Sequence, residues 1–170
     1  AELGLVMGLS WGLTRMSATM ATGAFLLYAA LNGVTMAFIF LAYTNESIAS
    51  TFLVTAGTFG AISMYGYTTK RDLTTWGSCF FMALIGLILA SVVNIFLQSS
   101  AIYWITTYAG VLIFVGLTAY DTQKIKELSA RIDASDAENF QKMAIMGALR
   151  LYLDFVNLFL YLLRILGKRR

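Results

Sequence analysis

The stretch WGSCFFMALIGLILASVVNIFL, Trp76–Leu97, decides the fold class. It holds no charged residue and is long enough to cross a bilayer as one helix, which takes about 20 residues. Outward from it lie four apolar runs of similar length and one shorter run: Thr22–Tyr43, Ser47–Tyr67, Ile102–Tyr120, Met143–Leu166, and the short Leu3–Leu13. We therefore predict an all-α, polytopic transmembrane helix bundle with six hydrophobic segments.

The composition of the whole chain points to lipid as its solvent. Of 170 residues, 59% are hydrophobic and only 12% are charged, about half the share of a soluble domain. A transmembrane β-barrel would alternate apolar and polar residues in short segments, whereas these runs are continuous. The chain has one cysteine, Cys79, and no histidine, which excludes an internal disulfide and a zinc cluster. A net charge of +3 without a basic cluster of the nucleic-acid type predicts no nucleic-acid partner.

The connections between the segments predict the orientation. Basic residues fall only in alternate links, which are expected to face the cytoplasm; they are Arg15, Lys70, Arg71, Lys124, Lys126, Arg131 and Lys142. The long link before the last segment begins as an amphipathic extension of the preceding helix. Its Ser135-Asp136-Ala137-Glu138 fits a capping box led by Ser135, so the last helix is expected to start outside the lipid. The basic tail 168–170 conflicts with this orientation: either the last helix is forced across the bilayer, or it dips in and returns.

Asp154 is the most informative ionisable residue. A charge near the centre of a membrane helix costs about 2.5–3.5 kcal/mol on insertion scales, so it is seldom retained without a role. At helical spacing it shares one polar stripe with Arg150, Asn157, Tyr161 and Arg164, on an otherwise apolar helix. Such a stripe lines a polar cavity or faces a charge on another helix. The alternative is a purely structural stripe, with Asp154 paired to Arg150 one turn away.

Asp121 ends the apolar run 111–120. Alone, it fits an interfacial residue at a helix end. If it meets Asp154, the two carboxylates cannot both ionise cheaply, and one keeps a proton near neutral pH. The pair would then form a pH sensor or a cation site without any histidine.

Two motifs carry a resemblance to a known family. GLTAYDTQKIK at 116–126 and LYLDFVNLFL at 151–160, together with YGYTTKRDL at 65–73, resemble the Bax inhibitor-1 family, the transmembrane Bax-inhibitor-motif proteins, in its bacterial branch. The resemblance covers essentially the whole chain. It implies a bundle of seven transmembrane helices with the last one central, so that 1–170 is a single transmembrane domain lacking the first helix. It also implies residence in the bacterial inner (plasma) membrane.

The same resemblance implies a function. Asp121 and Asp154 would form a pH-sensitive carboxylate dyad at a pore closed toward the cytoplasm, and the activity would be a pH-dependent calcium leak. Arg15 would act as a gating latch on the first of these acids. Arg150 departs from the family pattern: beside Asp154 it would hold that acid ionised and oppose calcium binding, with Asn157 a second modulating residue. Because calcium prefers six to eight oxygens, two carboxylates with water and carbonyls make a weak site that suits conduction.

Other functions were weighed against this one. Intramembrane aspartyl proteases need Gly-x-Gly-Asp and Pro-Ala-Leu motifs; Asp154 follows Tyr152-Leu153 and the chain has no proline, so we expect no enzyme and no cofactor beyond calcium as a permeant or bound ion. The alternative is a membrane interaction protein that restrains a partner such as a protease or a cell-death regulator. Its contact surfaces would be a glycine stripe, Gly4, Gly8 and Gly12, and the amphipathic link. The expected partners are thus the lipid bilayer, calcium or protons, and in the alternative another membrane protein.

Overall fold

The computed structural model describes residues 17–132 and 136–170. They form α2 (Ala18–Ala42), α3 (Asn45–Thr68), α4 (Thr74–Leu97), α5 (Ser100–Arg131) and α6 (Ala137–Leu166). All five helices are long and apolar enough to cross a membrane. The predicted all-α membrane bundle is therefore confirmed, but the predicted count of six segments is not matched. Leu3–Leu13, with its glycine stripe, lies outside the described residues.

The described helices begin at residues whose side chains can accept backbone hydrogen bonds, with one exception. Ser17, Thr44 and Ser99 cap α2, α3 and α5. Ser135, predicted to lead the capping box, lies outside the described residues. The cap of α6 is the next residue, Asp136, whose Oδ1 accepts from the Asn139 amide at 3.2 Å. Aspartate caps a helix as well as serine does, so the pattern alone could not fix the register. α4 has no side-chain cap of its own from Leu73.

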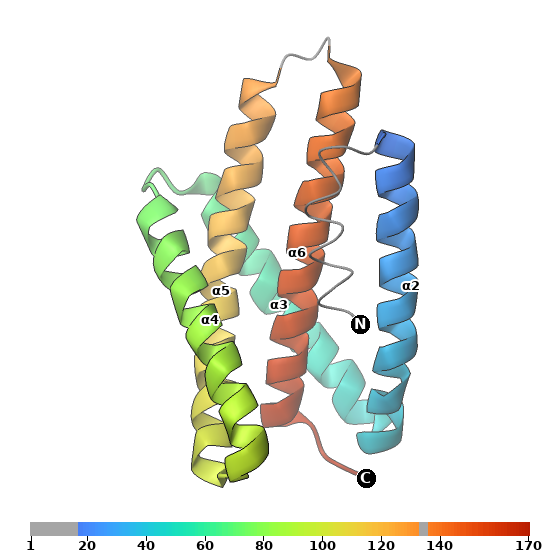
Figure 1. Ribbon diagram of the computed structural model, residues 1–170, viewed down its shortest axis with the longest axis vertical. Helices are drawn as coiled ribbons and strands as arrows, with labels where there is room; N and C mark the ends of the chain where they lie inside the picture. The colour runs from blue at the N-terminus through green and yellow to red at the C-terminus, as the bar shows by residue number, and fades with distance from the viewer. Residues whose placement is uncertain (1–16, 133–135) are drawn as a thin grey trace.

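Different connections between helices lie at the two ends of the bundle (Figure 1). The α3–α4 and α5–α6 connections lie at what we call the loop end. The α2–α3 and α4–α5 connections and the C-terminal tail 167–170 lie at the opposite end, the tail end. There the Thr44 amide donates to the Lys168 carbonyl and the Arg170 amide to the Ala42 carbonyl.

This arrangement favours the first of the two courses left open for the last helix, a full crossing. α6 is one continuous helix of 30 residues, about 45 Å long, whereas the hydrocarbon core is about 30 Å thick. It runs from the loop end to the tail end without turning back (Figure 1). The basic tail therefore lies beside the link that contains Thr44, at the end opposite the basic loops.

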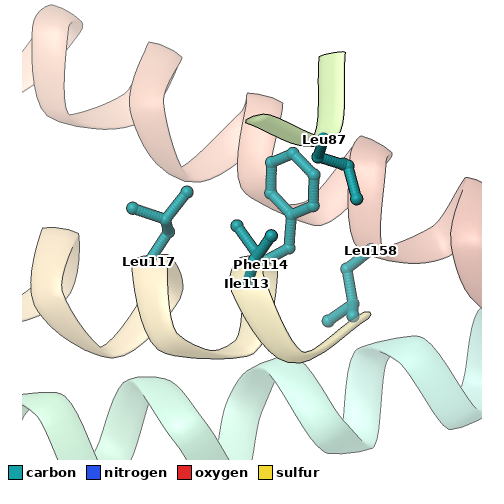
Figure 2. Packing of buried hydrophobic residues seen from close by; sticks show 5 residues of the cluster. All are labelled: Leu87, Ile113, Phe114, Leu117 and Leu158. Carbon is teal, nitrogen blue, oxygen red and sulfur yellow. The ribbon is translucent and has the colours of Figure 1, made fainter. Parts of the chain in front are cut away.

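α5 and α6 organise the packing. α5 contacts α3, α4 and α6, while α6 contacts α2, α3 and α5. Figure 2 shows the cluster where α4, α5 and α6 meet, with Leu158 fully buried against α5. The five buried residues of this cluster are Leu87, Ile113, Phe114, Leu117 and Leu158. By contrast, α2 and α4 expose large apolar side chains such as Phe38 and Phe96 over much of their length, as expected of faces turned to lipid.

A polar cavity between α4, α5 and α6

The polar stripe predicted on the last helix lies along a cavity of about 1320 Å³. α6 lines it with all the stripe residues: Arg150, Asp154, Asn157, Tyr161 and Arg164. The facing wall is α4, whose lining is mostly apolar, and α5 contributes residues from both ends of the cavity. The helical spacing in the sequence thus placed these side chains correctly on one face of α6.

Asp121 and Asp154 both line this cavity, one from α5 and one from α6. They are among the few buried charged side chains of the described chain, with 9% and 5% of their surface exposed. Their carboxyl groups lie close enough to interact with each other. Asp154 Oδ2 is buried and has no hydrogen-bond partner among residues 17–132 and 136–170. A buried acid oxygen without a partner is costly, so it is expected to hold a proton or to meet water or a cation.

Arg150 is placed differently from the sequence interpretation. Its Nη1 lies 3.6 Å from Asp121 Oδ1, across the α5–α6 interface. The pairing with Asp154 along α6, which was the alternative interpretation, is not the ion pair that forms; Arg150 pairs instead with Asp121 on the neighbouring helix. The Arg150 side chain is 49% exposed, whereas that of Asp121 is 12% exposed, so only the cationic partner of this ion pair is open to its surroundings.

Asn157 lines the cavity, but its side-chain NH2 group forms a hydrogen bond within its own helix. Its Nδ2 donates to the Leu153 carbonyl at 2.8 Å. Its side-chain oxygen is therefore the atom left for water or a cation.

A second basic side chain, Arg164, lies at the other end of the same stripe. The Arg164 guanidinium stands 5.1 Å from the Tyr161 ring centre and 5.6 Å from that of Tyr103. Tyr161 in turn stacks on Phe114, with ring centres 5.8 Å apart. The cavity thus has Arg150 and the two acids toward the loop end, and Arg164 with its tyrosines toward the tail end.

Two other predictions concern metal binding and the latch. Within 17–132 and 136–170, no three Cys, Asp or Glu side chains come together in a way that could hold a metal ion. Any calcium at Asp121 and Asp154 would need water and backbone oxygens to complete its shell. Arg15, the predicted gating latch, lies outside the described residues.

Gln123 has a structural role that no sequence pattern indicated. Its side chain is 6% exposed and joins α5 to the α3–α4 loop. Its Oε1 accepts from the Leu73 amide at 2.9 Å and its Nε2 donates to the Arg71 carbonyl at 2.8 Å. Both partners are backbone groups about 50 residues away in sequence, so no local pattern could reveal them.

Comparison with known proteins places the chain in a family of membrane proteins. The family model described as "Inhibitor of apoptosis-promoting Bax1" matches residues 1–170, and the chain belongs to this Bax inhibitor-1 family. Among similar proteins is the inner membrane protein YbhL of Escherichia coli K12, 59% identical over 170 residues, covering 100% of this chain and 73% of YbhL. The predicted family and the predicted location in an inner membrane are confirmed.

Two less similar proteins also match most of this chain. A Rickettsia prowazekii protein is 50% identical over 170 residues, covering 100% of this chain and 71% of its own length. A membrane protein of Streptococcus pyogenes serotype M3 is 42% identical over 157 residues, covering 92% of this chain and 67% of its own.

Proposed function

We propose that this protein is a pH-sensitive calcium, or more broadly cation, leak channel in which Asp121 and Asp154 act as an intramembrane carboxylate dyad. The observation that carries the proposal is that these two buried acids, from α5 and α6, line one cavity and interact with each other. Two adjacent carboxylates attract a divalent cation when both are ionised. They lose that attraction when one takes up a proton.

Arg150 supports a weak site rather than a storage site. Its ion pair with Asp121 offsets part of the negative charge that a calcium ion would meet. A permeant ion must bind well enough to enter and weakly enough to leave, so partial neutralisation suits conduction. The proposal includes Arg15 as a second cation that closes the path by pairing with Asp121.

The finer architecture belongs to the same proposal. In the whole protein, seven transmembrane helices would form the bundle, with α6 at its centre. The protein would act without enzymatic chemistry and without a cofactor, with lipid, calcium and protons as its partners. The described contacts of α6 with α2, α3 and α5 support its central place.

The test is calcium flux into proteoliposomes containing the full chain, stepped from about pH 8 to about pH 5, where a shared carboxylate pair changes protonation. Asp121→Asn and Asp154→Asn should each reduce the flux to that of empty liposomes, since Asn keeps the shape but cannot ionise. Asp136→Asn is the matched control, because Asp136 is an exposed helix cap and Asn caps equally well. It should conduct as the unchanged protein does.

The folding of each variant is checked by helical circular dichroism and a monodisperse profile in detergent. A well-folded protein with no flux above empty liposomes would refute the channel. It would favour the interaction role, with the aspartates as an internal structural pair. An Asp154→Asn variant that loses its helical signal would instead make Asp154 a structural residue.

A further inference from the structure

The loop end of α5 is held from several sides within a few residues of Asp121. The Gly66 Cα on α3 lies so close to the Ala119 backbone that a methyl group there would collide with the Ala119 carbonyl. On α4, Gly77 lies against the Tyr120 ring with no room for a methyl group. Close helix approach through glycine leaves α5 little freedom to slide at this level.

Gln123 adds hydrogen bonds to this packing. Its carboxamide bonds to Leu73 and Arg71, the backbone groups on either side of Asp72 in the α3–α4 loop. Leu73 is the residue before α4 and lacks a side-chain cap, so Gln123 Oε1 satisfies an amide that α4 itself leaves unpaired. Lys126 lies one turn further along and donates to the Tyr67 carbonyl at 2.7 Å.

The geometry of α5 relates Gln123 to Asp121. Two residues along a helix turn the side-chain direction by about 200°, so the two side chains point to nearly opposite faces. Gln123 faces the α3–α4 loop, and Asp121 faces the cavity and α6. Fixing the first side chain to a loop therefore fixes the rotation of α5 that presents the second to the cavity.

We propose that Gln123 is a positioning residue: by clamping the α3–α4 loop to α5, it sets the rotation and height at which Asp121 meets Asp154 and Arg150. This inference rests on the proposed function only where calcium flux is the quantity measured. Among the described residues, the charged groups that face Asp121 are Arg150 and Asp154, both on α6. A rotated α5 would change the distance from Asp121 to both of them.

The experiment compares Gln123→Ala and Gln123→Glu with Gln141→Glu in the full chain reconstituted in lipid. Gln123→Glu keeps an acceptor for Leu73 but sets a second oxygen against the Arg71 carbonyl, whereas Gln141 is exposed on α6. Hydrogen exchange of the peptide spanning 69–76 should become about tenfold faster in Gln123→Ala, the effect expected for loss of a buried hydrogen bond. The increase should be smaller in Gln123→Glu, which keeps the acceptor for the Leu73 amide. The Gln141 variant should exchange as the unchanged protein does. Unchanged exchange in both Gln123 variants would refute the clamp.

The positioning role has its own readouts. The pH titration of the buried carboxyls is followed by infrared difference spectroscopy, with Asp121→Asn identifying the Asp121 band, and the pH midpoint of flux is measured in parallel. Both midpoints should move in the Gln123 variants and stay fixed in Gln141→Glu. A lower amplitude at an unchanged midpoint would show a merely structural role and overturn the proposal. A shifted carboxyl titration in a protein without flux would support the positioning role while refuting the channel.

Discussion

At the scale of single residues, the decisive feature is which acidic side chain forms the ion pair with Arg150. The sequence spacing on α6 correctly put Arg150 and Asp154 on one face, but it could not show that Arg150 reaches across to Asp121. Periodicity describes one helix at a time, whereas an ion pair between helices depends on how the helices are docked. The predicted stripe therefore lines a cavity, whereas the alternative, an ion pair along α6 between Asp154 and Arg150, is replaced by the pair of Arg150 with Asp121.

Replacing Arg150 tests whether this cation opposes cation binding. Arg150→Gln should tighten calcium binding about fivefold, because removing a partly exposed ion-pair partner changes local electrostatics by about 1 kcal/mol. The measurement is calorimetric calcium titration of the protein in nanodiscs. Lys142→Gln is the matched control, since Lys142 on α6 pairs with Glu138 at the surface. Equal or weaker calcium binding by Arg150→Gln would show that Arg150 does not oppose the site.

At the scale of helices, hydropathy located each described element, although α5 runs 11 residues past the apolar run that ends at Tyr120 and α6 begins six residues before Met143. The run predicted for Trp76–Leu97 is α4, Thr74–Leu97, and the run ending at Leu166 is α6, which ends at the same residue. Length and apolarity suffice here because a helix in lipid must satisfy its own backbone. The helix contacts could not be predicted in the same way, since glycines that touch a neighbour and glycines that face lipid look alike in sequence.

Gly66 and Gly57 of α3 allow that difference to be measured. Gly66→Ala should lower the free energy of unfolding by about 1–3 kcal/mol, because its methyl group would collide with the Ala119 backbone and force α3 and α5 apart. A methyl group at Gly57 would meet only open space, so Gly57→Ala should be neutral or stabilising by up to about 1 kcal/mol through helix propensity. Thermal unfolding in detergent, followed by circular dichroism, compares the two. Equal effects at both positions would mean that the α3–α5 approach is not tight.

At the scale of the whole molecule, the unusual feature is that the bundle carries basic residues at both ends. The α3–α4 loop with Lys70 lies at one end, and the tail that contains Arg169 pairs with Tyr43 at the other. A hydrogen bond to the Tyr43 side chain raises the pKa of Arg169 above its usual value, so this arginine stays charged where it lies. Loop charges decide orientation during insertion, and an odd number of further crossings can then carry a basic tail to the opposite side.

Thiol labelling tests this orientation directly. In a Cys79→Ser background, we expect Ser100→Cys and Lys168→Cys to react with a membrane-impermeant thiol reagent added outside cells, because both positions are exposed at the tail end. Lys70→Cys, exposed at the loop end, should react only after the membrane is opened. Labelling of Lys168→Cys and Lys70→Cys from the same side would show that α6 does not cross the bilayer. Reversal of all three results would keep the crossing but place the loop end outside.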